Sequence, residues 1–206
     1  MNKTAPICVA LAAALLAAGC RTPTTYVRDG DPVPAMAALG NQDVRAAATE
    51  LTDSLLRSGR LDAPGGGLYV VTVGKVVNDT MQHFDTDILT DMITDELTAS
   101  GKVAVTAAIT GANDKPDRVD STLAVTRQAR GNDEFNQSTV PGKGNLVAGS
   151  FSLSGRISQR ENLNDNGDKQ VDYYFRMRLV DQTTGLEVWA RQVYVGKITD
   201  RRSPTW

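Results

Sequence analysis

The chain has 206 residues with 22 basic and 24 acidic side chains, a formal charge of −2, 41% apolar residues and 5% aromatic residues. A domain of this size buries enough surface to fold without a metal or a disulfide, and the lack of a basic excess excludes a typical nucleic-acid binder. Two cysteines, Cys8 and Cys20, and one histidine, His83, are too few for a zinc site or a redox pair. We therefore expect no cofactor, no metal and no nucleic-acid partner.

The N-terminus has the features of a secretory signal peptide. Lys3 lies near the start, an apolar run extends from Ile7 to Ala18, and small residues lead up to Gly19-Cys20. The apolar run is shorter than the roughly 20 apolar residues that a permanent membrane-spanning helix needs. We therefore predict that residues 1–19 are a signal peptide that is removed during export.

The segment Leu16-Ala17-Ala18-Gly19-Cys20 resembles the lipobox of bacterial lipoproteins. In that class the chain is cut between the positions of Gly19 and Cys20. The cysteine then carries a diacylglycerol and a further acyl chain such as palmitate, which together anchor a protein stably. The alternative is an ordinary signal peptidase site, which would leave Cys20 as an unpaired thiol because Cys8 is lost with the signal peptide.

Arg21 follows the cysteine. In the enterobacterial lipoproteins that this segment resembles, an aspartate at that position retains the protein at the inner membrane. The resemblance therefore implies a lipid anchor on the periplasmic face of the outer membrane.

The stretch after Cys20 is predicted to be a flexible tether. Residues 21–41 contain three prolines and two glycines and show neither strand nor helix periodicity. About 20 extended residues would reach at most about 70 Å. The predicted organisation is a signal peptide at 1–19, a lipidated cysteine and tether at 20–41, and a globular domain at 42–206.

The domain is predicted to start with a helix and a strand. Residues 42–58 carry one apolar stripe at helical spacing, and Gly59 follows where a helix would end. Residues 68–77 are rich in valine and nearly continuous in apolar character, as in a strand covered on both faces. Gly65-Gly66-Gly67 precede this strand and lack a following GKS/T motif, so they indicate a turn and not a phosphate loop.

A second helix is predicted to begin at Asp85 or Asp87 and to end before Gly101, with a short strand at 103–106 after it. Its predicted buried stripe consists of Ile88, Leu89, Met92, Ile93 and Leu97. The acidic residues of this helix could be a metal cluster or a carboxylate pair. Their place near a helix N-terminus and on a solvated face explains them better.

A third helical pattern follows Pro116 and extends to Ala129, and residues 146–157 then alternate between apolar and polar as a strand does. The segment NLNDNGD at 162–168 resembles the start of a calcium loop. The last position of such a loop would be Tyr173 and not the required glutamate. Its Asn-Gly pair instead predicts a hairpin turn.

Residues 171–181 and 186–197 are predicted to pair as a hairpin whose one face gathers aromatic and arginine side chains, which are common in binding hot spots. This candidate partner-binding set consists of Tyr174, Arg176, Arg178, Trp189 and Arg191. In the predicted register, Trp189 lies opposite Arg178. Arg176 lies opposite Arg191, an unfavourable pair unless an acidic group intervenes or the register shifts by one residue. The alternative is a face that is solvated or covered by a helix.

The order of these elements resembles the LpoB family of penicillin-binding-protein activators. The resemblance covers most of Leu68 to Ile198. Its strongest local matches are the aspartate-started helix ending in Ser100-Gly101-Lys102 and the hairpin with Asp181, Thr184-Gly185 and Trp189.

The resemblance implies an α+β fold like the N-terminal domain of TolB, with a small mixed, mostly antiparallel sheet of four to five strands and about three helices. Members of the family are outer-membrane lipoproteins that bind and stimulate a class A penicillin-binding protein, a peptidoglycan synthase, and so regulate cell-wall biogenesis and cell shape. The resemblance carries over no catalytic residue, so we expect neither an enzyme nor a small-molecule substrate.

Two other functions are weighed. One is an outer-membrane accessory or assembly subunit of an envelope or secretion complex. The other is a hydrolase, which is disfavoured because His83 lies just before a helix and no nucleophile with a base beside it is apparent.

Overall fold

The chain divides by its internal contacts into two units, residues 1–35 and Met36–Trp206. The computed structural model describes residues 26–28, 31, 35–108, 123 and 125–204. In the first unit the Arg28 amide donates a hydrogen bond to the Asp31 carboxylate at 2.7 Å. The helices and strands described below all lie in the second unit. Among the described residues, no helix has the length and apolar character needed to cross a membrane.

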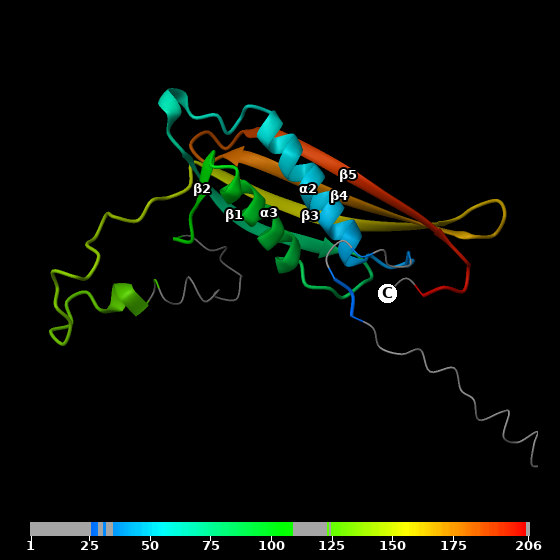
Figure 1. Cartoon of the computed structure of the whole chain (residues 1–206), viewed down its shortest axis with the longest axis horizontal. Helices are drawn as coiled ribbons and strands as arrows, with labels where there is room; N and C mark the ends of the chain where they lie inside the picture. Colours follow the sequence, from blue (N-terminus) through cyan, green and yellow to red (C-terminus); the bar gives the residue numbers. More distant parts are fainter. Residues whose placement is uncertain (1–25, 29–30, 32–34, 109–122, 124, 205–206) are drawn as a thin grey trace, which may run out of the picture. The chain divides into compact units, whose positions relative to one another are not determined.

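A five-stranded mixed sheet forms the centre of the second unit (Figure 1). In chain order the elements are α2 (Asn41–Arg57), the short 3-10 helix η1 (Pro64–Gly66), β1 (Tyr69–Asp79), α3 (Asp87–Ala99), β2 (Val103–Val105), β3 (Phe151–Leu163), β4 (Lys169–Asp181) and β5 (Glu187–Thr199). The strand order is β2-β1-β3-β4-β5. β1 is parallel to both of its neighbours, whereas β3–β4 and β4–β5 are antiparallel. The predicted α+β fold class is confirmed.

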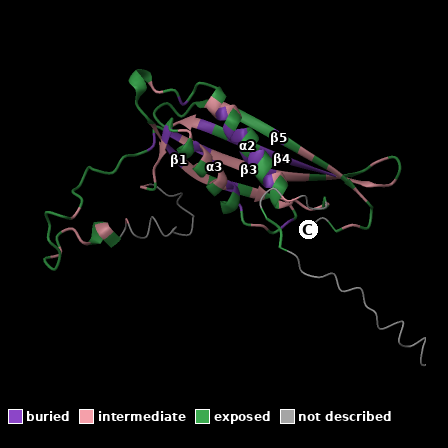
Figure 2. Cartoon of the chain, viewed as in Figure 1, coloured by how far each residue is buried: buried purple, intermediate pink, exposed green. Residues whose placement is uncertain are grey.

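Helices α2 and α3 lie side by side against one face of the sheet and enclose the core, as the buried residues in Figure 2 show. The buried residues of α2 include the apolar stripe Val44, Ala47, Ala48, Leu51 and Leu55. α3 buries Leu89, Ile93 and Leu97, but Ile88 is half exposed and does not belong to its buried stripe. Alternate residues of β3 and β4 complete the core from the sheet side, with Ile157 and Phe175 almost fully buried.

The segment before α2, residues 36–40, is fastened to the domain. Its backbone makes three hydrogen bonds to distant side chains: Tyr173 Oη donates to the Ala37 carbonyl at 3.1 Å, Lys197 Nζ donates to the Ala38 carbonyl at 2.7 Å, and the Leu39 amide donates to Gln82 Oε1 at 3.0 Å. Burial raises the pKa of Tyr173 to about 12, so its hydroxyl remains a donor at neutral pH. The fastened part of the domain therefore begins before the predicted boundary at residue 42.

Two predicted elements lie in the connection between β2 and β3. Of the third helix, Leu123 and residues 125–128 are helical, Ala129 lies in a turn, and the remaining residues lie outside the described part of the chain. The strand predicted from residue 146 begins at Phe151. The hairpin predicted from Asn-Gly joins β3 to β4, with the Gly167 amide bonded to the Asn164 carbonyl at 2.9 Å and Gly167 at a φ of 83°.

The segment just before β3 crosses the other face of the sheet at β1 and requires a glycine. A Cβ atom at Gly149 would lie 2.3 Å from Thr72 Oγ1 and 2.8 Å from the Thr72 amide nitrogen. Neighbouring hydrogen bonds hold this segment in place, from the Ser150 amide to the Val70 carbonyl at 2.7 Å and from Thr106 Oγ1 to the Val147 carbonyl at 2.9 Å.

We expect Gly149→Ala to lower the free energy of unfolding by about 1–3 kcal/mol. The added methyl group would clash with Thr72, and the hydrogen bonds described above keep the segment close to β1. Urea denaturation measures this change. Gly142→Ala is the matched control, since the nearest atom to its new Cβ would be 3.7 Å away. Equal stability of the two variants would contradict the close approach at Thr72.

Candidate functional site

The pairing of β4 with β5 determines on which face of the sheet each predicted partner-binding residue lies. The predicted register is wrong: Trp189 pairs with Leu179 and Arg191 pairs with Met177, so neither lies opposite an arginine. The sequence analysis had placed both side chains on the face that carries Arg176.

The cause is an irregularity at the start of β5. Val180 pairs with Glu187, and the next pair along the ladder is Leu179 with Trp189, so Val188 is an extra residue on β5. Because side chains alternate between the two faces of a sheet, one extra residue exchanges the faces of all that follow. The observed register therefore avoids the pairing of Arg176 with Arg191, which would be unfavourable.

The five predicted residues therefore form two groups on opposite faces of the sheet. Trp189 and Arg191 lie on the face that packs against α2. Tyr174, Arg176 and Arg178 lie on the other face, which no described helix covers. Whether either group binds a partner stays a prediction.

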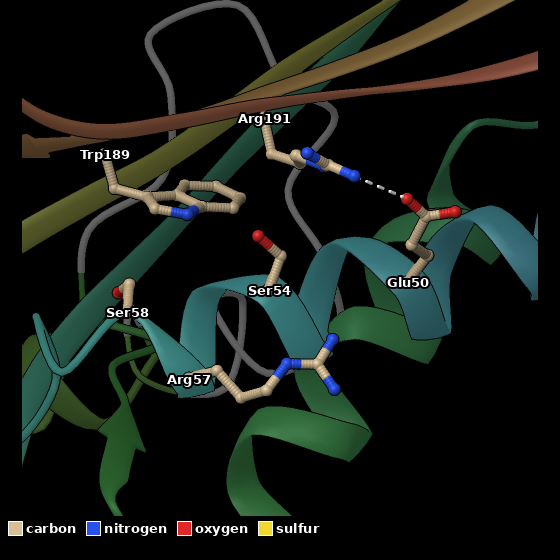
Figure 3. Close-up of a pocket in the computed structure, with 6 residues that line it drawn as sticks. All are labelled: Glu50, Ser54, Arg57, Ser58, Trp189 and Arg191. Carbon is tan, nitrogen blue, oxygen red and sulfur yellow. Dashed lines mark hydrogen bonds and ion pairs between the residues drawn. The ribbon is translucent and has the colours of Figure 1, made fainter.

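The first group lines a groove of about 440 Å³ between α2 and β5 (Figure 3). Its six lining residues are Glu50, Ser54, Arg57, Ser58, Trp189 and Arg191. Trp189 and Arg191 extend from β5 toward the helix, and Arg57 points away from the indole ring. Sequence analysis did not identify the helix side of this groove, because only the tertiary structure brings Glu50 close to β5.

The charges of this groove are already paired. Arg191 Nη2 lies 3.0 Å from Glu50 Oε1, and Arg57 Nη1 lies 3.6 Å from Asp53 Oδ2 on the same helix. These pairs are exposed and contribute little to stability. Because both arginines of the groove are paired, the groups that it offers to a partner are mainly the serine hydroxyls and the indole of Trp189.

The second group belongs to a surface that we call the arginine face, formed by outward-pointing side chains of β3, β4 and β5. It consists of Arg156, Arg160, Tyr174, Arg176, Arg178 and Tyr194. All four arginines are exposed. The serine residues that alternate with core residues along β3, among them Ser154 and Ser158, lie beneath and between them.

Arg156 and Arg176 lie directly opposite each other on β3 and β4. Each guanidinium reaches outward to a carboxylate on another strand, Arg156 to Asp79 at 3.7 Å and Arg176 to Glu187 at 3.6 Å. Arg178 donates a hydrogen bond to the Ser154 hydroxyl at 3.2 Å and has no ion-pair partner among the described residues.

A buried carboxylate fixes the aromatic side chains of this face. Asp172 is 5% exposed, and its Oδ1 accepts hydrogen bonds from Tyr194 Oη at 2.8 Å and from Gln170 Nε2 at 2.9 Å. The hydrogen bond to Asp172 raises the pKa of Tyr194. The rings of Tyr174 and Tyr194 lie 5.6 Å apart between centroids. Sequence analysis missed Tyr194, although the correct register alone would have placed it beside Tyr174.

The described part of the chain has further side chains, outside these two surfaces, of the types that bind metals or act in catalysis. Its histidine, cysteine and carboxylate side chains form no group of three or more that could hold a metal ion. His83 lies exposed in the loop between β1 and α3. Cys20 and Gly19, the predicted lipidation and cleavage residues, lie outside the described residues, and so does Cys8.

A family model matches most of this chain. The family model described as "Peptidoglycan-synthase activator LpoB" matches residues 43–195, from the first turn of α2 to Val195 of β5. A search of curated proteins gives no match.

Solved structures of similar fold were also found. The LpoB C-terminal domain from Escherichia coli is 17% identical, with a TM-score of 0.46, over 75% of this chain and 99% of that chain. The corresponding domain from Salmonella enterica is 18% identical, with a TM-score of 0.44, over 74% and 98%. A PelC dodecamer from Paraburkholderia phytofirmans is 17% identical, with a TM-score of 0.32, over 69% and 80%. These likenesses are too distant to assign a function.

Proposed function

The chain belongs to the LpoB family of peptidoglycan-synthase activators, and on this basis we propose that it is an outer-membrane lipoprotein that binds and stimulates a class A penicillin-binding protein. The observation that carries the proposal is the family match, which includes α3, α2 except its first two residues, and all five strands except the last four residues of β5. The family is one of regulators, and the chemistry of wall synthesis belongs to the synthase.

The protein acts by binding in this proposal and not by catalysis. Two surfaces of the domain offer what a protein partner needs, an aromatic anchor beside charged groups. These are the groove at Trp189 and the arginine face. The absence of a catalytic role is itself part of the proposal.

The proposed anchor is a lipid on Cys20, at the periplasmic face of the outer membrane. Support comes from the sequence, where an apolar run ends in Gly19-Cys20 and arginine follows. The first residue of the fastened domain is Met36. The anchor and the domain would thus be joined by residues 21–35.

Stimulation of a purified synthase tests the proposed function. The mature lipidated protein, purified in detergent, is added at increasing concentrations to a purified class A synthase, and the rate of glycan-strand polymerisation is measured. We expect the rate to rise and to saturate as the synthase becomes fully bound. The same protein unfolded by heat is the control. A rate that does not change, together with no detectable binding to the synthase, would overturn the proposal.

A further inference from the structure

We propose that the arginine face is the docking surface for the synthase and that it receives an acidic surface of that partner. This inference rests on the proposed function. Four observations support it: the part of the sheet that no described segment covers, the excess of exposed arginine, the position of Arg156 against Arg176, and the fixed tyrosines beside them.

The part of this face that no described segment covers lies over β3, β4 and β5. α2 and α3 occupy the opposite face, and the segment around Gly149 crosses only at β1, where it buries Thr72. The remaining strands are 13 residues long each, so the face is wide enough for a protein partner. Tyr194 and Ile198 are exposed on it to 53% and 70%, apolar surface that a partner would cover.

Positive charge on this face is only partly balanced. Four arginines share the face with three carboxylates, Asp79, Asp172 and Glu187. Asp172 is buried and bonded to Tyr194, so it presents little negative charge at the surface. Arg178 has no carboxylate partner among the described residues. A partner with carboxylates at matching positions would complete these charges, and such complementarity guides both association and orientation.

The position of Arg156 against Arg176 is unfavourable in the free domain. Like charges directly opposite each other on neighbouring antiparallel strands destabilise a sheet. The two exposed ion pairs, to Asp79 and Glu187, offset this repulsion weakly because they are long and open to solvent. A carboxylate placed between the two guanidinium groups would relieve the repulsion, and arginine is well suited to grip it with two parallel hydrogen bonds.

The two tyrosines beside the arginines are held in place by their neighbours. Tyr194 lies across Gly196, where a Cβ atom would come within 2.7 Å of the tyrosine ring carbon Cζ, and its hydroxyl is fixed on Asp172. Tyr174 lies against the same ring. A surface that is already ordered loses less conformational entropy on binding than a mobile one.

The groove at Trp189 fits an acidic partner less well. Its one arginine that faces the indole, Arg191, is held by Glu50 at 3.0 Å. An incoming carboxylate would have to displace Glu50 and would meet its negative charge. We therefore assign the docking of an acidic partner to the arginine face and not to the groove.

The test compares two double variants of the mature lipidated protein in detergent. One is Arg156→Gln/Arg176→Gln on the arginine face, and the control is Arg45→Gln/Arg60→Gln, which removes the same charge at two exposed arginines outside both candidate surfaces. The Kd for a purified class A synthase is measured at several salt concentrations, and thermal unfolding of each free protein is recorded. We expect the arginine-face variant to raise the Kd by about tenfold and to weaken its salt dependence. The control variant should bind as the unchanged protein does.

Thermal unfolding separates a lost contact from a lost fold. Because Arg156→Gln/Arg176→Gln removes a repulsion, we expect its unfolding temperature to stay the same or to rise while affinity falls. Equal binding by the arginine-face variant, or an equal loss of binding in the control variant, would overturn the docking surface and leave the proposed function intact. So would sedimentation of the unchanged protein as a dimer that only the arginine-face variant disrupts, since the occupant would then be a second copy. A failure of the unchanged protein to bind the synthase would overturn both proposals.

Discussion

Replacing Phe175 by alanine is expected to remove most of the stability of the domain. Phe175 lies in the middle of β4, between Ile157 of β3 and Val193 of β5, and is 1% exposed. Truncating such a side chain costs about 3–5 kcal/mol, the sum of lost burial and the cavity left behind. A domain with a total stability of about 5–15 kcal/mol has little margin for this loss.

Urea denaturation of the purified protein measures this effect as a shift of the transition midpoint to lower denaturant. Phe135→Ala is the matched control, because Phe135 is 51% exposed in the connection before β3 and its loss should change stability by about 0.5 kcal/mol or less. A midpoint for Phe175→Ala equal to that of the control would show that this core is not the one described.

Cys20→Ser is expected to abolish anchoring of the protein at the outer membrane. Each buried methylene of a lipid chain contributes about 0.8 kcal/mol to membrane binding. In the lipoproteins whose lipobox this segment resembles, the lipid is attached to the cysteine thiol, which serine lacks. Processing at Gly19-Cys20 should stop, and stimulation of the synthase in cells should be lost. Membrane fractionation and mass spectrometry of the mature N-terminus measure these outcomes.

The control for this variant is Cys8→Ser. Cys8 lies within the predicted signal peptide, so its loss should leave the mass of the mature protein and its membrane location unchanged. A mature protein whose N-terminus carries no lipid, or begins before Cys20, would contradict the predicted anchor. Loss of anchoring in both variants would instead indicate that export itself had failed.

Much of the fold could be predicted because its elements have strong local patterns. The stripe from Val44 to Leu55 fixes which side of α2 is buried, and the Asn-Gly pair fixes the turn between β3 and β4. These patterns depend on residues within a few positions of one another. The start of the domain could not be predicted from local patterns, because residues 36–40 are held by side chains far along the chain, such as Tyr173 and Lys197.

The face on which each candidate residue lies could be predicted for β4 but not for β5. Tyr174, Arg176 and Arg178 were grouped correctly, since alternation along one strand needs no partner. Trp189 and Arg191 were placed on the wrong face, because the register across a hairpin depends on one extra residue at Val188. No local pattern at the end of β4 indicates that irregularity.

The sequence by itself determined most of the elements, the apolar stripe of α2, the alternation of faces along β3 and β4 and the family resemblance, and it led to the prediction of a lipid anchor at Cys20. Local spacing and residue type determine these features, and both can be recognised within a short segment of the chain. Only the tertiary structure decided that Arg156 faces Arg176, that Glu50 reaches Arg191, and that the predicted binding residues divide between two faces. The physical reason is that pairing register and helix packing are chosen by the burial of the whole core, and a shift of one residue in the ladder exchanges the faces of every residue that follows.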